Sequence, residues 1–294
     1  MSVGLGLPIG DPAQLLSWAR RAEATPFRTV ALLDRLVFGN PEPLITLATL
    51  AGATSRIRLQ TEVLLAPLHR TALLAKQAAT LDLLSGGRFT LGIGIGGRED
   101  DYLAAGVDLR TRGRRLDTQM AALRRVWSGA PLSADVGPIG PAPARPGGPE
   151  VLFGGFVPAV VERVARWGDG FLGAALPPRH MDRMFRDVEA AWSRAGRTGR
   201  PRLLAQVNVA LGPESVLARA REDLSAYYGP DNSYTEHIVN GLLTTPAQIR
   251  AAVADYRAIG ADEVMLYCWA PDPEQVERLA EAAFGSDGAP AGTD

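Results

Sequence analysis

Acidic and basic side chains stand together at the ends of two predicted inner strands. Asp34 and Arg35 follow the apolar run 29–33, and Glu62 lies in the segment QTEV, which ends a second β-rich run. A carboxylate in a buried strand needs a partner, and Arg35 or Arg98 can supply one. These residues therefore form either part of a polar site or a structural ion pair at the rim of a sheet.

Glycine recurs at every second position of the strand-like segment RFTLGIGIG (88–96). Glycine normally weakens a strand, so Gly92, Gly94 and Gly96 require a reason. One reason is a ligand, because a strand face without side chains lets a flat, bulky molecule lie against the main chain. The other is close packing or a tight turn, which glycine serves equally well. The segment has no P-loop lysine and lacks the spacing of the dinucleotide fingerprint.

A second glycine pair closes another predicted strand in the segment FGGFVPAV, where Pro158 starts a helix. Main-chain N–H groups exposed at such a helix start bind phosphate. Gly154, Gly155 and Phe156 are therefore candidates for a phosphate site, and a simple tight turn is the alternative.

The histidines and the cysteine do not form a recognisable metal or nucleophile motif. His69, His180 and His237 lack metal-ligand spacing, and Cys268 is the only cysteine. The sequence contains no H-E-x-x-H, no G-x-S-x-G and no Cys–His pair. We therefore expect no metal site, and a hydrolase is disfavoured.

Eight strand-then-helix units must position these residues. The predicted strands cover 3–8, 29–33, 56–67, 88–96, 150–155, 170–175, 202–211 and 263–269, with helices over 213–228 and 246–259 before the last strand. Alternating strands and helices pair the strands in parallel, and eight such units in 294 residues favour a (β/α)₈ TIM barrel over an open doubly wound sheet. Barrel ligands bind at the C-terminal ends of the strands, where the residues above stand.

The barrel is expected to be a single domain that covers residues 1–285. The Pro/Gly-rich segment 137–149 is predicted to be a long loop inside it, which either partly covers the barrel mouth or only connects two elements. The tail 286–294 is expected to be disordered.

Composition and charge favour a cytoplasmic protein without a nucleic-acid or membrane partner. The formal net charge is -1, and acidic residues are interspersed with basic ones. The N-terminal segment MSVGLGLPIGDP lacks the features of a signal peptide, and no run of about 18 apolar residues is present. A single cysteine agrees with a reducing compartment.

Several longer segments resemble those of the bacterial luciferase-like flavin-dependent oxidoreductases. They are TSRIRL (54–59), LLAKQAATLDLLSGGRFTLGIGIGG (73–97), DDYLAAGV (100–107), RGRRLD (112–117), ARWGDGF (165–171) and IGADEVML (259–266). The resemblance extends from about residue 3 to residue 280, and its central block is long and specific to the family.

The resemblance implies a barrel that holds FMN, or its deazaflavin relative coenzyme F-420, at the C-terminal mouth. It also implies a bulge or a non-proline cis peptide in the third strand, at Thr61–Val63, behind the isoalloxazine ring. The turn with Gly154 and Gly155 would meet the phosphate side. The cofactor-binding residues implied in this way are Asp34, Thr61, Glu62, Val63, Gly94, Gly96, Arg98, Gly154, Gly155 and Phe156.

Four departures from the family pattern bear on the chemistry. Arg35 stands where many members have histidine, and Gln60 replaces a glycine two residues before Glu62. Thr118 stands where a glutamate is common. Gly97 stands where deazaflavin sugar-phosphate dehydrogenases have a glutamate, which disfavours that chemistry. Gln60 and Glu62 either retune the pocket or fill it.

These features predict a luciferase-like monooxygenase that uses reduced FMN and O₂ on a small organic substrate. A separate flavin reductase would supply the reduced FMN, and Arg35, Glu62 and His69 are the candidates for substrate orientation or proton transfer. The alternatives are a reductase or dehydrogenase that depends on deazaflavin coenzyme F-420, and a non-catalytic flavin-binding or ligand-binding barrel. Family members are often dimers, so a homodimer is expected.

Overall fold

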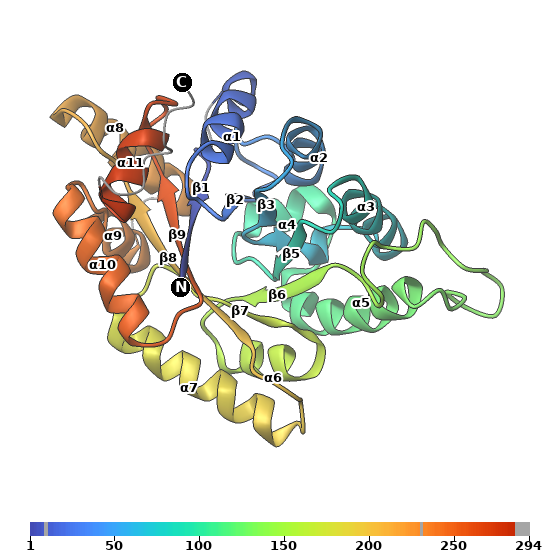
Figure 1. Cartoon of the computed structure of the whole chain (residues 1–294). Helices are drawn as coiled ribbons and strands as arrows, with labels where there is room; N and C mark the ends of the chain where they lie inside the picture. The colour runs from blue at the N-terminus through green and yellow to red at the C-terminus, as the bar shows by residue number, and fades with distance from the viewer. Residues whose placement is uncertain (9–10, 230–231, 286–294) are drawn as a thin grey trace.

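The computed structural model describes residues 1–8, 11–229 and 232–285, and in it the strands form one closed parallel barrel (Figure 1). The strands run in the order β3-β2-β1-β9-β8-β7-β6-β5-β4, and β3 also pairs with β5, which closes the ring. The strands are β1 (Ser2–Gly6), β2 (Thr29–Leu32), β3 (Arg58–Thr61), β4 (Leu64–Leu65), β5 (Phe89–Gly94), β6 (Glu150–Gly154), β7 (Gly170–Leu172), β8 (Arg202–Val209) and β9 (Glu263–Cys268). The predicted (β/α)₈ barrel is confirmed, and the open sheet is not formed.

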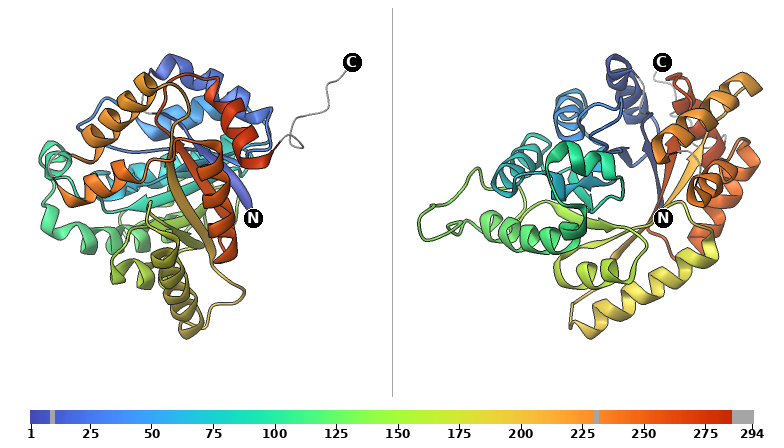
Figure 2. Two further views of the ribbon diagram at one scale, coloured as in Figure 1. Left: turned by 90° about the vertical axis from the view of Figure 1, so that its left-hand side faces the viewer. Right: turned by 180° about the vertical axis from the view of Figure 1, so that it is seen from behind.

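Helices surround the barrel on all sides, as two further views show (Figure 2). They are α1 (Leu15–Glu23), α2 (Pro43–Ala53), α3 (Thr71–Leu84), α4 (Glu99–Ala105), α5 (Arg112–Trp127), α6 (Pro158–Trp167), α7 (Pro178–Arg194), α8 (Glu214–Tyr228), α9 (Ser233–Asn240), α10 (Pro246–Ala258) and α11 (Gln275–Phe284), with short 3₁₀ turns at Pro12–Gln14, Ala66–Leu68 and Leu109–Thr111. Helix α9 was not predicted. Among the described residues, no helix has the length and apolar character needed to cross a membrane.

Local sequence signals explain where several helices begin and end. Helices α2 and α10 begin with a proline in the first turn, and Thr245 with Gln248 forms a capping box at the start of α10. Helix α3 stops at Gly86 and Gly87, whose φ angles are 64° and 78°. Glycine adopts such angles without steric cost, so the chain can turn there into β5.

The predicted third strand, 56–67, is divided into β3 and β4 by a bulge. Gln60 pairs with Thr90 and Leu64 pairs with Ile93. Between these two pairs the chain advances four residues on this strand but only three residues on β5. One extra residue is therefore inserted between the two pairs, which is the definition of a β-bulge. The peptide bond Glu62–Val63 is cis, at the place where the family resemblance implied a bulge or a cis peptide.

A charged layer fills the amino-terminal end of the barrel interior. The first residues of four strands meet there: Arg58 bonds to Glu150 at 2.6 Å, and Arg202 bonds to Glu150 at 2.7 Å and also to Glu263. Each guanidinium is paired with a carboxylate, as buried charges must be. The amino-terminal end is thus closed by ion pairs, and the open end lies at the opposite side.

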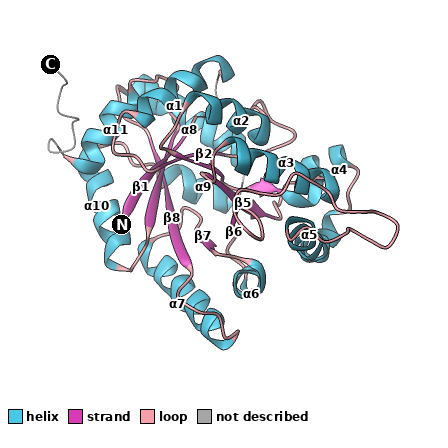
Figure 3. Cartoon of the chain, turned by 45° about the vertical axis from the view of Figure 1, so that its right-hand side comes forward, coloured by secondary structure: helices cyan, strands magenta, loops and turns pink. Residues whose placement is uncertain are grey.

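The long loop before β6 does not reach the barrel mouth. It extends past α5 away from the strands (Figure 3), and it is held by Lys76, which donates to the carbonyl of Gly140 at 2.9 Å, and by Asp82, which accepts from the backbone N–H of Arg145. The segment 137–149 joins a helix end to a strand start, and such connections lie at the amino-terminal side of a barrel. It is therefore a connector and not a mouth cover, and the tail 286–294 lies outside the described residues.

Candidate functional site at the barrel mouth

A cavity of about 460 Å³ opens at the C-terminal ends of the barrel strands. This mouth cavity has the size of a small-molecule or cofactor site. The sequence-predicted residues that line it are Asp34, Arg35, Glu62, Val63, Gly94, Gly96, Arg98, Gly154, Gly155 and Phe156. The closed barrel brings these residues together from β2, the bulge, β5 and β6, although they lie far apart in the sequence.

Two predicted site residues do not line the mouth cavity. Thr61 is fully buried behind it, and its Oγ1 donates to the carbonyl of Gly92 at 2.7 Å. His69 follows the turn Ala66–Leu68 and packs toward α5, where Gln119 donates to its carbonyl at 2.9 Å. Burial lowers the pKa of His69, which favours the neutral ring.

The alternating glycines make room for the bulge. A Cβ atom on Gly94 would lie 2.5 Å from Cγ2 of Val63, and one on Gly154 would overlap Cγ1 of the same valine. A Cβ atom on Gly96 would lie 2.9 Å from Leu65. The close approach of Val63 and Leu65 thus gives the packing alternative a physical basis, and Gly94 and Gly96 also line the mouth cavity.

Glu62 is a buried acid at the inner wall of the mouth cavity. The residue is 4% exposed, and Gln60 donates from Nε2 to its Oε2 at 2.9 Å. Burial raises the pKa of Glu62 to about 8, because the charged form loses its water shell. Near neutral pH the carboxyl is therefore mostly protonated and can donate a hydrogen bond. Gln60 and Glu62 do not fill the mouth.

Arg35 lies at the rim of the cavity but is held by the protein itself. Its Nε donates to Asp101 at 2.5 Å, one Nη donates to Asp100 at 3.1 Å and the other Nη donates to the carbonyl of Tyr227 at 2.7 Å. The oxygen Oδ1 of Asp101 accepts from the backbone N–H of Val37. This network joins the end of β2 to α4 and α8. Arg35 therefore holds the wall of the mouth cavity in place.

Asp34 holds the second half of the bulge in place. Its Oδ2 accepts from the backbone N–H of Leu65 at 2.8 Å, which fixes β4 against β2. Burial raises the pKa of Asp34 to about 6, and the negative charges of Glu42 and Asp101 act in the same direction. The carboxyl can therefore change its charge near physiological pH.

The turn after β6 offers main-chain donors to the cavity. Gly155 has a φ of 144°, which side-chain-bearing residues rarely adopt. Helix α6 begins three residues later, and its N-cap, Val157, makes no side-chain cap. Pro158 has no N–H group, and the N–H of Val160 donates to the carbonyl of Val157 at 2.9 Å, so the donors that this turn can offer are the N–H groups of Phe156, Val157 and Ala159. Arg98 and Arg112 line the same cavity and add positive charge.

Aromatic side chains from α8 and α9 complete the wall, and sequence reasoning missed them. Tyr227, Tyr228 and Tyr234 line the cavity with Phe156. The ring of Tyr234 lies 5.7 Å from that of Phe156 and 5.7 Å from that of Tyr228. These tyrosines do not stand at the end of a predicted strand. The only sequence signal was the adjacent pair Tyr227–Tyr228, and this pair matches no known motif. Gln206 was also missed, because it lies inside β8 and not at the end of a strand.

Comparisons with known proteins agree with this architecture. A family described as luciferase-like monooxygenase matches residues 2–263. The uncharacterized protein Rv0953c of Mycobacterium tuberculosis is 32% identical over 176 residues, which is 56% of this chain and 60% of that protein. The oxygenase component of the flavin-dependent trigonelline monooxygenase of Acinetobacter baylyi is 34% identical over 91 residues, 30% of this chain and 25% of that protein.

Solved structures share the fold at low sequence identity. An F-420-dependent secondary alcohol dehydrogenase, in complex with an F-420–acetone adduct, has a TM-score of 0.78 and 16% identity, with 96% of this chain and 98% of that chain covered. The oxygenating constituent of the 3,6-diketocamphane monooxygenase of Pseudomonas putida, in complex with FMN, has a TM-score of 0.72 and 17% identity, with 97% of each chain covered. Among these comparisons the family match spans nearly the whole chain, and by it this protein belongs to the luciferase-like monooxygenase family.

Proposed function

We propose that the protein is the oxygenase of a flavin-dependent system, which uses reduced FMN and O₂ to oxidise a small organic substrate. The observation that carries the proposal is the mouth cavity, where the bulge at Glu62–Val63 lies beside the uncapped start of α6. Family membership supports an oxidoreductase, and flavin-dependent monooxygenases occur among the relatives.

The residues present fit an FMN phosphate and ring. Main-chain N–H groups at the start of α6 would hold the phosphate, because a helix start binds anions. Arg98 donates to Asp100 at 3.2 Å and to the carbonyl of Tyr228 at 3.4 Å, and its side chain is 39% exposed, against 5% for that of Arg35. It is therefore better placed than Arg35 to contribute positive charge near an anionic ring. The backbone at Glu62–Val63 would lie behind the ring.

The remaining residues prepare the cavity for substrate. When bound, reduced FMN would supply the electrons that activate O₂. Glu62 would hold a proton at its carboxyl, in the neutral form that burial favours, and Gln60 would fix the orientation of that carboxyl. Tyr228 and Tyr234 would exclude water from the same space.

The mouth cavity would also accept the deazaflavin coenzyme F-420. A reductase or dehydrogenase that depends on F-420 is therefore the second candidate. An F-420-dependent enzyme shares the fold. The absorbance spectrum of the purified protein separates the candidates: flavin peaks indicate FMN, one band at longer wavelength than NADH indicates deazaflavin, and no band after titration with either contradicts both. The last result would favour the non-catalytic alternative.

A reductase partner and a homodimer belong to this proposal. The sequence has no dinucleotide-binding fingerprint, and the trigonelline relative is named as an oxygenase component.

Helices α2 and α3 pack side by side and expose Ile45, Leu73 and Leu84 at 68%, 55% and 64%. Apolar side chains on neighbouring helices are a suitable surface for a second copy of the chain. O₂ uptake that requires reduced FMN and a substrate, and a dimer mass by light scattering, are the expected results.

A further inference from the structure

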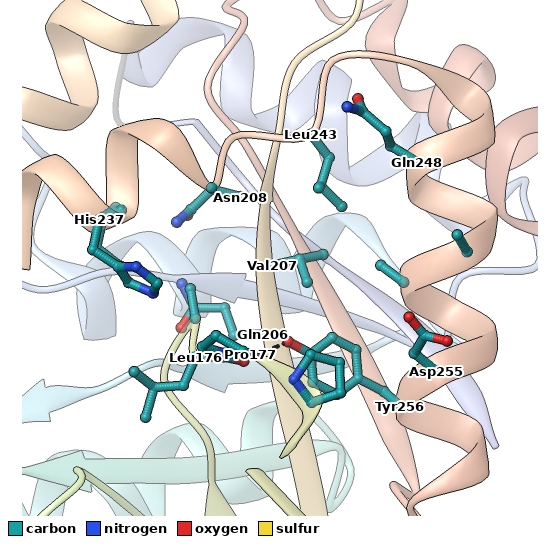
Figure 4. A pocket seen from close by; sticks show the side chains of 16 residues that line it. Leu176, Pro177, Gln206, Val207, Asn208, His237, Leu243, Gln248, Asp255 and Tyr256 are labelled. Atoms are coloured by element: carbon teal, nitrogen blue, oxygen red, sulfur yellow. Dashed lines mark hydrogen bonds between the residues drawn. The ribbon is translucent and has the colours of Figure 1, made fainter. Parts of the chain in front are cut away.

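A second cavity lies beside the barrel, between the loop after β7, strand β8 and helices α9 and α10 (Figure 4). Its volume is about 310 Å³, at the lower end of the range for small-molecule sites. Its walls are mostly apolar, with Leu176, Val207, Leu243 and Ala252 among them. We call it the side cavity, and the proposed oxygenase chemistry does not use it.

Asn208 directs an unused hydrogen-bond donor into the side cavity. The residue is only 2% exposed, and its Oδ1 accepts from Nε1 of Trp269 at 2.9 Å. An indole nitrogen can only donate, so this bond fixes which end of the amide is the oxygen. The nitrogen Nδ2 points toward the space beside His237 (Figure 4), and no hydrogen bond from it to another described residue is found.

Other polar groups gather at the same end of the cavity. The imidazole of His237 projects from α9 toward Asn208, and the amide of Gln206 lies below it (Figure 4). Gln206 precedes Asn208 by two residues on β8, so the two side chains share one face of the strand. Gln206 lines both cavities and therefore separates the side cavity from the barrel mouth.

The opposite end of the cavity has different chemistry. Asp255 stands there beside Tyr256 (Figure 4), whose hydroxyl donates to the carbonyl of Leu176 at 2.6 Å and is therefore occupied. A ligand thus meets donors at one end, an apolar middle, and an acceptor at the other end. Nδ2 of Asn208 faces the cavity and donates to no other described residue, so an oxygen of a ligand can accept from it.

We propose that the side cavity binds a small, mostly apolar molecule that carries a carbonyl or carboxylate oxygen. The oxygen accepts from Nδ2 of Asn208, and the apolar body passes the edge of β8, which pairs with β7 only at Arg202–Leu204, to pack on Val207, Leu243 and Ala252 on the other face. This site is separate from the mouth cavity and does not depend on the proposed cofactor.

Binding of simple probes to the full chain tests the proposal. Hexanamide offers a neutral carbonyl, hexanoate a carboxylate, and hexane a similar chain with no polar group. The readout is the indole N–H resonance of Trp269 in protein with isotope-labelled tryptophan, assigned among the five tryptophans with Trp269→Phe. A ligand on Nδ2 polarises the amide that Trp269 contacts. Hexanamide or hexanoate should shift this resonance saturably, and hexane should not.

Two variants separate specific from unspecific binding. Asn208→Asp keeps an acceptor for Trp269 but removes the donor, and should weaken binding of the shifting probe about tenfold. Ala251→Phe fills the cavity from the exposed side of α10 and should abolish saturation, whereas Ala254→Phe, exposed on the same helix but outside the cavity, should not. The absence of a saturable shift with either oxygen-bearing probe, or unchanged affinity in Ala251→Phe, would overturn the proposal.

Discussion

Gln60 donates a hydrogen bond from its Nε2 to Oε2 of Glu62 at 2.9 Å, inside the barrel. Both side chains are almost fully buried, and the remaining side-chain oxygen of each has no partner among the described residues. The pair replaces the apolar inner wall that a barrel strand would otherwise present. Its position at the inner wall of the mouth cavity leaves about 460 Å³ open beside it.

Glu62→Gln should make stability less sensitive to pH. The pKa of Glu62 in the folded protein is about 8, above the ordinary value of 4.5. Between these values the unfolded chain loses this proton and the folded protein keeps it, so stability falls as the pH rises. The slope from this group is about 1.4 kcal/mol per pH unit, and glutamine removes it while still accepting from Gln60.

Urea unfolding of both proteins at several pH values between about 5 and 8 measures this difference. The glutamine variant should gain stability relative to the native protein as the pH rises. Parallel curves would mean that the carboxyl of Glu62 ionises in the fold at its ordinary pKa.

Gly94→Ala should destabilise the barrel by about 1–3 kcal/mol, because the added methyl would overlap Val63. The second substitution Val63→Ala removes the atoms that the methyl would meet. The double variant should therefore be more stable than the sum of the two single changes predicts. Additive changes in a thermal or urea denaturation cycle would show that the bulge does not pack against this glycine.

Gly155→Leu should lower FMN affinity at least about tenfold, which is 1.4 kcal/mol or more. The φ of 144° is unfavourable for leucine, so the turn that presents main-chain N–H groups would be distorted. Titration of FMN fluorescence gives the affinity, and circular dichroism shows whether the variant is folded. A folded variant with native affinity for both FMN and the deazaflavin would show that the phosphate does not bind at this turn.

Arg35→Leu should cost about 3–5 kcal/mol of stability, because it leaves the buried carboxylate of Asp101 without its partner. The matched control is Arg219→Leu in the exposed pair with Asp223, which should change stability by less than about 1 kcal/mol. Equal effects in chemical denaturation would contradict the structural role. Proteolysis between β8 and α10 should also become faster in Arg35→Leu, since Tyr227 loses its contact.

His69→Gln should leave cofactor affinity unchanged. The side chain does not line the mouth cavity, and its main-chain carbonyl makes the contacts with Arg115 and Gln119. FMN titration of the variant and of Gly155→Leu in parallel provides the comparison. A marked loss in His69→Gln would bring this residue back as a candidate for the site.

The order of elements was readable from the sequence because it depends on local patterns. Buried parallel strands are continuous apolar runs, helices carry N-cap and proline signals, and eight alternations leave few topologies. The same logic placed Asp34, Glu62 and Gly155 at strand ends. Since strand ends converge in a closed barrel, most predicted site residues met in one cavity.

Only the tertiary structure decided what each site residue contacts. The sequence could not show that Val63 packs against Gly94, that Asp101 engages Arg35, or that two tyrosines of α8 line the mouth. These facts depend on contacts between segments far apart in the chain, and local sequence patterns do not predict such contacts. Burial of Glu62, and hence its raised pKa, likewise exists only once the barrel has closed around it.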